Sequence, residues 1–378
     1  MAESKPRMIF LGPQHPGAPG NVAFKVWLKG EKVVKAELVP GFLHRGFEKM
    51  MENRWWEVDV VLSPRYCVED PDNFELAYVL AVEDLFGVEA PEKAKMVRTI
   101  VAEMSRIQSH LFWLMHMGGA VGARYIPGWA MAAREEILKW YDYVTGHRIY
   151  HHYMTPGGIR WNVPKDFKEV TLKTLSKVLP IVKDIEDAFV NNRILRARTE
   201  GIGVVKGYVA VQLNATGPTL RAAGIKYDVR KVDPYEAYGD VDFEIPTGTN
   251  GDSLDRIIVR IKEIYQSKHI IEQLVERVRP DDLNYRVKMP LLPPPSLPWP
   301  AVARHGEGMS RVEAARGEAM VHVVGIKDRK PYRVKLITPS MPLLTTVIDY
   351  IIEHEDVTIA DLPVIVMSLD PCAPDIDR

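Results

Sequence analysis

Long segments whose apolar residues recur at helical spacing fill the middle of this chain. In residues 91–117 the apolar side chains fall every three or four positions, as Met96, Ile100, Val101, Met104, Ile107, Leu111 and Leu114. The same spacing predicts further helices at residues 73–86, 129–144, 167–195 and 253–277. Helices of this length with short connections pack together along their apolar faces. We therefore expect a helical bundle as the core of the fold.

Short β elements are expected near the N-terminus. Residues 22–28 and 32–38 alternate apolar and polar side chains, and Lys29-Gly30 lies between them. Two alternating runs joined by a glycine-containing turn are typical of a β-hairpin. The sequence therefore predicts a small N-terminal sheet beside the helices.

A second group of β elements is expected before the C-terminus. Residues 319–326 and 332–337 have β character and flank a polar turn. A final helix is predicted at residues 343–354, and a short apolar strand at residues 364–367 leads into the last segment. The predicted fold class is α+β, a long-helix bundle core with small β elements near the N-terminus and before the C-terminus.

We predict three regions within one integrated domain. Residues 1–40 hold the hairpin, residues 41–290 form the helical core, and residues 291–378 hold a proline-rich crossing, a small β element and a C-terminal site segment. Apolar side chains are interleaved with the prolines of residues 291–300. We therefore interpret this stretch as an extended crossing and not as a loose linker.

Charge and hydropathy exclude several classes of partner. The chain has 49 Lys and Arg against 50 Asp and Glu, so its formal net charge of −1 gives no electrostatic case for binding nucleic acid or an anionic membrane. No apolar run approaches the roughly 20 residues that span a bilayer. Residues 1–7 are polar and do not resemble a signal peptide. We expect a cytoplasmic protein that can dock on a membrane subunit.

The two cysteines each lie in a motif that resembles a two-cysteine metal site with its second cysteine replaced. Cys67 is followed three residues later by Asp70, and Cys372 three residues later by Asp375. Two thiolates and two carboxylates bind a soft transition metal much less well than four thiolates do. Buried packing is the default role of a free cysteine. However, Arg65 lies two residues before Cys67, and a nearby guanidinium favours the nucleophilic thiolate.

Other candidate motifs are weaker. His15 and His44 each lie in loop-like segments, where histidines often bond to the backbone. His151 and His152 resemble a metal pair, but adjacent residues on a helix do not face one another, so we reject a site there. The glycines of residues 201–207 match a dinucleotide fingerprint poorly, and no strand-turn-helix unit surrounds them.

Several motifs together resemble one protein superfamily. They are Gly12-Pro-Gln-His-Pro16, Gly41-Phe-Leu-His-Arg-Gly46, residues 215–221 with Asp228-Val-Arg230, and residues 311–318. Their order is similar to that in the 49 kDa-type quinone-site subunit of respiratory complex I and in the catalytic large subunit of membrane-bound [NiFe] hydrogenases. The resemblance covers roughly residues 11–378, so it implies the hydrogenase-large-subunit fold.

The resemblance to the hydrogenases implies a site without nickel and iron. In that family the first cysteine of each motif is a terminal nickel ligand, and the second bridges the two metals. By position, this chain keeps the terminal ligands Cys67 and Cys372 but has Asp70 and Asp375 at the bridging places. We therefore expect no hydrogenase activity and no metal bound by this chain.

The resemblance to the quinone-site subunit also breaks at its key residues. The second histidine of that family's N-terminal loop falls at Pro19 here. The family's quinone-headgroup tyrosine falls near Glu69, and Tyr66 is close in sequence but out of register. Quinone reduction would then lack both proton donors.

What remains resembles the large subunit of the archaeal membrane-bound sulfane sulfur reductases. This resemblance implies the substrate-site subunit of a membrane-anchored, ferredoxin-dependent polysulfide reductase coupled to ion translocation. Cys67 and Cys372 would be the redox or sulfur-binding pair, because a thiolate attacks sulfane sulfur as it attacks a disulfide. Arg65 would stabilise a thiolate or an anionic polysulfide. The candidate proton donors are Asp70, Asp375 and Glu69.

The resemblance also implies partners. His15 would face a [4Fe-4S] cluster in an adjacent small subunit, since two cysteines are too few for this chain to hold such a cluster itself. Antiporter-like subunits of a membrane arm and ferredoxin would complete the complex. The chain would lie on the cytoplasmic side of the cell membrane, peripherally and without a transmembrane segment.

Two other classes of function stay open from the residues. In one, the chain is a quinone-reductase-like or electron-transfer subunit whose cysteines only pack. In the other, it is a non-catalytic scaffold that holds a cluster subunit against a membrane arm. A variant of the main prediction has the partner's cluster attack sulfur directly.

Overall fold

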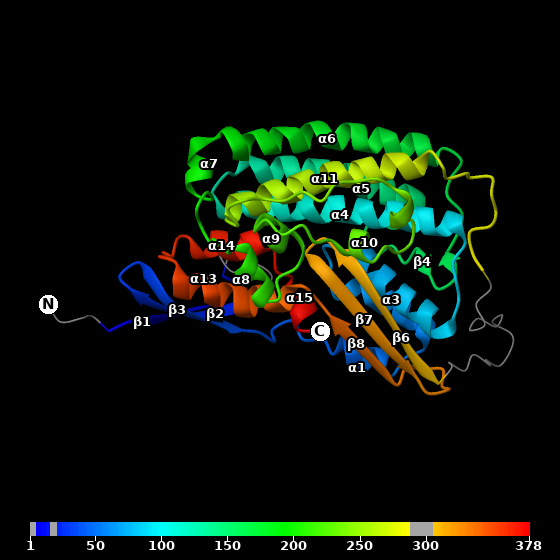
Figure 1. The fold of residues 1–378 in the computed structure, drawn as a ribbon, viewed down its shortest axis with the longest axis horizontal. Coiled ribbons are helices and arrows are strands. Elements are labelled where there is room, and N and C mark those ends of the chain that lie inside the picture. The colour runs from blue at the N-terminus through cyan, green and yellow to red at the C-terminus, as the bar shows by residue number, and fades with distance from the viewer. Residues whose placement is uncertain (1–4, 16–20, 288–304) are drawn as a thin grey trace.

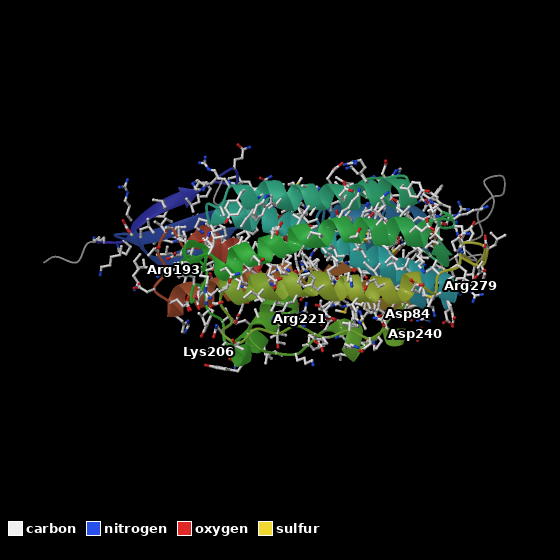
Figure 2. All side chains as sticks on the ribbon, turned by 90° about the horizontal axis from the view of Figure 1, so that it is seen from above. Asp84, Arg193, Lys206, Arg221, Asp240 and Arg279 are labelled. Atoms are coloured by element: carbon white, nitrogen blue, oxygen red, sulfur yellow. The ribbon has the colours of Figure 1, made fainter. Side chains whose placement is uncertain are left out.

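The computed structural model describes residues 5–15, 21–287 and 305–378. A layer of long helices runs along the molecule above the β elements (Figure 1). It consists of α4 (Glu92–Ala120), α5 (Tyr125–Thr145), α6 (Phe167–Asn191) and α11 (Ser253–Val275). Figure 2 shows Arg193 and Arg279 at opposite ends of this layer. The predicted helical core is confirmed.

Helix α4 is the centre of this layer and is buried on nearly all sides. It contacts α5, α11 and the later α14 (Leu362–Leu369). Its apolar residues pack into the core, and its polar side chains Arg98, Glu103 and Arg106 are buried as well. A charged side chain inside a protein needs partners, so this helix brings ion pairs into the core.

Helix α3 (Pro71–Phe86) carries the sheet that lies below the layer. It begins with proline at its first position and ends at Gly87, whose φ of 62° is the left-handed cap that glycine favours. The sheet has the antiparallel order β6 (Gly306–Ala314), β7 (Gly317–Gly325) and β8 (Arg333–Ile337). The structure confirms the strands predicted at residues 319–326 and 332–337 and adds β6.

The N-terminal sheet lies at one end of the molecule (Figure 1). Strands β2 (Ala23–Lys29) and β3 (Lys32–Val39) form the predicted hairpin, and β1 (Arg7–Leu11) adds a strand that was not predicted. Helix α13 (Ile348–His354) packs against β3. The N-terminal sheet is thereby joined to the C-terminal part of the chain.

The C-terminal segment departs from the predicted secondary structure. The strand predicted at residues 364–367 is wrong, because these residues lie in α14. Val364 packs in one apolar cluster while Ile365 and Val366 pack in another, so the segment is buried on two sides. A short, fully apolar run of this kind has no periodicity that separates helix from strand.

The predicted helix at residues 343–354 is present but begins as a π-helix. Residues Leu343–Val347 (η3) have the π form, preceded by α12 (Ser340–Pro342) and followed by α13. The predicted helix at residues 167–195 is shorter, since α6 ends at Asn191 and Asn192 caps α7 (Arg193–Ala197). The predicted crossing at residues 291–300 lies outside the described residues.

Short elements connect these parts of the structure. They are α1 (Phe47–Met51), α2 (Trp56–Leu62), η1 (Ser63–Arg65), β4 (Met154–Thr155), β5 (Gly158–Ile159), α8 (Gly207–Gln212), α9 (Gly217–Ala222), α10 (Val229–Val232), η2 (Tyr238–Asp240) and α15 (Ala373–Ile376). Within the described ranges, no helix is both long and apolar enough to cross a membrane.

Two apolar clusters form the core. One joins the helical layer to α3 and the β6–β8 sheet, and the other joins the N-terminal sheet to α8, α9 and the C-terminal helices. Both clusters draw residues from more than one of the three regions predicted from the sequence, whose boundaries at residues 40 and 290 stay predictions. The last residues of the chain lie between the clusters, because Cys372 belongs to the first and Ala373 to the second.

Candidate functional site

The two cysteines meet inside the protein. The sulfurs of Cys67 and Cys372 and a carboxylate oxygen of Asp375 all lie within 4.8 Å of one another. All three residues are buried, and both cysteines are free thiols. Thus residues from the start of α3 and from the end of the chain form one compact cluster, which we call the thiol site.

Local backbone structure explains how each cysteine reaches the thiol site. Cys67 follows η1 and precedes α3, so its position is fixed by the start of a long buried helix. On the other side, Asp370 ends α14 with a left-handed φ of 56°. This conformation is uncommon outside glycine, and here it turns the chain so that Cys372 points back into the core. The amide of Cys372 donates to Ser340 Oγ at 3.1 Å.

Arg316 is the guanidinium that contacts the thiols. It lies at the turn between β6 and β7, and its Nη1 is 3.5 Å from Cys67 Sγ. Its Nη2 is 3.1 Å from Asp370 Oδ1 and also pairs with Glu69. These neighbouring carboxylates and thiols raise the pKa of Arg316 despite its burial. A fixed positive charge beside a sulfur stabilises the thiolate form.

Glycine is required where this turn meets α9. Gly317 has φ of 136°, and a Cβ at this position would lie 2.4 Å from Thr216 Oγ1 and 2.9 Å from the Gly217 amide nitrogen. The close approach holds the turn against the neighbouring helix start. Arg316 therefore projects from a rigid point toward Cys67. The sequence signal for this arginine was its place within the motif of residues 311–318.

Arg65 makes its described contacts away from the sulfur of Cys67. Its Nη1 donates to the Val61 carbonyl and lies 2.8 Å from His152 Nε2, and its guanidinium stacks on Tyr150 at 4.9 Å. Arg65 still belongs to η1, which turns its side chain back along α2. The guanidinium within hydrogen-bond distance of Cys67 is that of Arg316, and the role predicted for Arg65 toward a thiolate or an anionic polysulfide stays a prediction.

Asp375 is the carboxyl group of the thiol site. Its Oδ2 accepts from Ser340 Oγ at 2.7 Å, whereas its Oδ1 is buried and finds no hydrogen-bond partner among the described residues. Burial raises the pKa of Asp375 to about 7. The pKa of Cys372 is also raised, by its hydrogen bond to Cys67 and by burial. Two groups with raised pKa values thus lie beside Cys67.

The two other predicted proton donors lie differently. Asp70 accepts three hydrogen bonds, from Asn73 Nδ2 at 2.7 Å, Ser105 Oγ at 2.9 Å and the Ala315 amide at 2.7 Å. Burial still raises the pKa of Asp70. With its oxygens occupied, it supports the start of α3 and the β6–β7 turn. Glu69 is partly exposed and paired with Arg316, so it lies at the rim of the thiol site.

The histidines singled out in the sequence lie apart from one another. His15 follows β1 in a turn, where its amide donates to the Gly12 carbonyl at 3.0 Å and its side chain is exposed. His44 Nδ1 lies 2.5 Å from the Asp377 carbonyl and fastens its loop to the chain's end. His151 bonds to Asp72 at 2.8 Å, whereas His152 contacts Arg65. The two adjacent histidines lie between α5 and β4 and not on a helix as the sequence argument assumed, and they bond to different partners.

The donor atoms of the thiol site do not fit a nickel–iron centre. Such a centre needs bridging thiolates, but the bridging places hold Asp70 and Asp375, and the oxygens of Asp70 are taken up by hydrogen bonds. The guanidinium of Arg316 lies 3.5 Å from Cys67 Sγ, where its positive charge opposes a metal cation. The cluster suits thiol chemistry better than soft-metal binding.

Comparison with known proteins identifies the family. Residues 120–378 match the family described as the 49 Kd subunit of respiratory-chain NADH dehydrogenase. This chain belongs to that family. A subunit of the NADH-quinone oxidoreductase of Thermosipho melanesiensis is 37% identical over 98% of this chain and 99% of its own length. A subunit of the F(420)H(2) dehydrogenase of Methanosarcina mazei is also 37% identical, over 100% of this chain and 99% of its own.

A solved structure extends the match within the 49 kDa-subunit family. A chain of the membrane-bound sulfane sulfur reductase, an archaeal respiratory membrane complex, is 39% identical, with a TM-score of 0.92 and 100% of both chains covered. The predicted fold and resemblance are confirmed, and the chain is a subunit of a complex I-related oxidoreductase. The three relatives are named for different reactions at identities of 37% to 39%, so identity alone does not choose the substrate.

Proposed function

We propose that this chain carries the substrate site of a sulfane sulfur reductase, with polysulfide as the substrate class. The observation that carries the proposal is the thiol site itself: Cys67 and Cys372 face each other beside Arg316 and Asp375 in the core. Two adjacent thiols can pass between dithiol and disulfide, which a quinone reductase does not require.

The reaction proceeds in three balanced steps. The thiolate of Cys67 attacks an internal sulfur of the polysulfide dianion, so that one sulfur–sulfur bond forms, another breaks, and a shorter polysulfide dianion leaves. The thiolate of Cys372 then attacks the Cys67 sulfur, forming a Cys67–Cys372 disulfide and releasing the bound sulfur as sulfide or a short polysulfide. Two electrons reduce this disulfide to two thiolates. The net change is reduction of one sulfur–sulfur bond by two electrons.

Neighbouring groups handle the charges in these steps. Arg316 stabilises the thiolate of Cys67 and the anionic substrate as it approaches. Cys372 must lose its proton before it attacks, and a carboxylate oxygen of Asp375 lies within 4.8 Å of its sulfur. Asp375 Oδ1 has no hydrogen-bond partner among the described residues. With a pKa of about 7, Asp375 can take this proton and return it to a leaving sulfide near neutral pH.

The electrons would reach the site through other subunits. We propose a [4Fe-4S] cluster in an adjacent small subunit, ferredoxin as the donor, and antiporter-like subunits of a membrane arm that use the released energy for ion translocation. Family membership and the likeness to a chain of a respiratory membrane complex support this assembly. His15 and the loop that contains His44 are the candidate contacts on the cluster side.

The test is to remove each sulfur within the purified complex. Cys67→Ser and Cys372→Ser should lower polysulfide-dependent oxidation of reduced ferredoxin to background, because neither variant can form the disulfide. Ser176→Ala, an exposed change on α6, is the matched control and should retain wild-type turnover. Cys→Ala variants and thermal melting show that any loss does not come from unfolding.

The alternatives predict different outcomes. If the cysteines only pack, as in a quinone-reductase-like subunit or a scaffold, all four cysteine variants retain turnover and the proposal fails. Direct attack on sulfur by the partner's cluster gives the same result. Metal analysis of the complex adds a second check, since stoichiometric nickel together with hydrogen evolution would contradict the proposed thiol chemistry.

A further inference from the structure

A cavity of about 510 Å³ is lined in part by Thr338 and Arg378, whereas the cysteines of the thiol site are not among its described lining residues. Two of its lining residues, Ile337 and Met341, are 43% and 38% exposed, so the cavity opens to solvent. The lining is otherwise formed by the ends of β7 and β8, the α12 and η3 segment, the loop after α8, and Arg378.

The inner end of the cavity is bonded to the thiol site. Thr338, a buried lining residue, donates through Oγ1 to the Asp375 carbonyl at 3.3 Å. Two residues further on, Ser340 donates to the Asp375 carboxylate and accepts from the Cys372 amide. The cavity wall and the cysteine loop are therefore parts of one hydrogen-bonded unit.

The lining combines six apolar residues with five neutral polar ones, which are Asn214, Thr216, Thr338, Thr345 and Thr346, and with two charged ones. The apolar members are Leu213, Met320, Ile337, Pro339, Met341 and Pro342. The charged members are Glu318 and Arg378. Glu318 is already paired with Arg311 at 2.7 Å and accepts from Tyr227 at 2.7 Å.

Arg378 keeps capacity for a further anion. Its Nε is 3.5 Å from Glu48, but Glu48 also pairs with Arg333 at 2.8 Å and Lys335 at 3.2 Å. Its Nη1 is buried and has no hydrogen-bond partner among the described residues. A buried, unpartnered guanidinium nitrogen costs free energy unless a ligand completes it.

We propose that this cavity binds the distal part of the polysulfide chain and leads its reacting sulfur past Cys372 into the thiol site, where Cys67 attacks it. A polysulfide dianion has a polarisable, weakly hydrated chain of sulfur atoms and negative charge at its ends. The apolar walls suit the chain, and Arg378 suits a terminal charge. This assignment rests on the proposed function and adds the route and the binding subsite.

The first experiment measures access to the thiols. Met341→Trp and Thr345→Trp place a large side chain at the cavity, and they should slow alkylation of Cys372 by iodoacetamide in the reduced complex about tenfold. Met309→Trp is the matched control, because Met309 is 54% exposed on β6 and does not line the cavity. Mass spectrometry follows each cysteine, and melting temperatures confirm that the variants are folded.

The second experiment measures binding of substrate. With inorganic tetrasulfide, Arg378→Gln and the two cavity variants should raise KM about tenfold while kcat changes less than twofold. Longer polysulfides should show the larger effect, because more of their chain lies in the cavity. The Met309→Trp control should leave both kinetic constants unchanged.

The outcomes separate this inference from the proposed function. Unchanged alkylation and unchanged KM in the cavity variants would overturn the route, while loss of turnover in Cys67→Ser would still support the reaction. Val68→Trp changes a residue next to Cys67 that does not line the cavity. If only this variant slowed alkylation, polysulfide would enter beside Val68, and the proposed route through the cavity would be overturned. A wild-type complex without polysulfide turnover would overturn both.

Discussion

Two buried polar regions of this molecule are built differently. One, which we call the ion-pair network, joins α4, α10 and β6 through Glu103, Asp228, Arg230 and Glu313. Arg230 reaches Asp228 at 2.6 Å and Glu103 at 3.0 Å. Among the described residues, every side-chain nitrogen and oxygen of these four has a hydrogen-bond partner.

Around the thiol site, several buried polar atoms have no hydrogen-bond partner among the described residues, although Asp370 Oδ2 lies 3.6 Å from Arg260 Nε. They include Asp375 Oδ1, Asp370 Oδ2 and Arg316 Nε. A buried polar group without a partner destabilises a fold, so natural proteins retain such groups mainly where they serve a purpose. The comparison teaches that charge burial alone does not mark a functional site. A functional site is marked instead by buried polar atoms that lack hydrogen bonds and lie beside reactive side chains.

The largest expected effect breaks the ion-pair network. Arg230→Met should lower the free energy of unfolding by about 3–5 kcal/mol, because it leaves Asp228 and Glu103 buried with uncompensated charge. Chemical denaturation of the purified chain measures this change. A loss below about 1 kcal/mol would show that the ion-pair network is not the structural element described above.

Changing the thiol site should lower activity without lowering stability. Asp375→Asn should reduce polysulfide turnover about 100-fold, which is typical for loss of a proton-transfer group. Because the base form of Asp375 takes the proton of Cys372, wild-type turnover should fall as pH drops through about 7, and the variant should lack this limb. Rate measurements from pH 5 to pH 9 test both points.

The same substitution gives a stability control. The pKa of Asp375 is raised from 3.8 in the fold, so the folded wild type loses stability as pH rises from about 4 to about 7. The asparagine variant should be as stable as the wild type at pH 4 and more stable at pH 8. Lower stability at pH 8 would mean that Asp375 is a structural acceptor.

Asp59 on α2 is a buried carboxyl group that belongs to neither region. It tests whether a raised pKa alone, without reactive side chains nearby, affects stability and not turnover. Burial raises its pKa to about 9, and its contacts are with Tyr78, whose hydroxyl is 3.5 Å from Oδ2. Wild-type stability should therefore decline as pH rises from about 4 through about 9. Asp59→Asn should remove at least about 1 kcal/mol of that decline, since one pKa unit corresponds to about 1.4 kcal/mol.

Melting temperatures of wild type and Asp59→Asn at pH 5, 7 and 9 measure the difference. The gap should widen with pH in favour of the variant, with polysulfide turnover unchanged. A change in turnover would connect Asp59 to the thiol site, which no contact in the described structure suggests.

The smallest effect is expected at an exposed ion pair. Lys168 and Glu276 lie 2.5 Å apart with side chains 51% and 56% exposed. Solvent screens such pairs, so Lys168→Ala should change the free energy of unfolding by less than about 1 kcal/mol. A loss comparable to that of Arg230→Met would remove the distinction between buried and exposed pairs on which the comparison rests.

Much of the fold follows from local sequence patterns. The long helices were predicted because each carries an apolar stripe over several turns, and the β2–β3 hairpin because its turn contains glycine. The segment at residues 364–367 could not be assigned in this way, since four apolar residues without polar neighbours fit a buried helix or a strand. In the structure this segment is helical, and its side chains pack into two apolar clusters on different sides of the helix.

The sequence by itself determined the reactive residue types: two thiols, each followed by an aspartate, in a chain whose motifs resemble one superfamily. Only the tertiary structure decided which residues meet. It joined Cys67 to Cys372, separated Asp375 at the thiols from Asp70 in a closed set of hydrogen bonds, and gave the guanidinium contact to Arg316. Local periodicity reports on neighbours within a few residues, whereas these contacts join positions far apart in the chain through packing of separate elements.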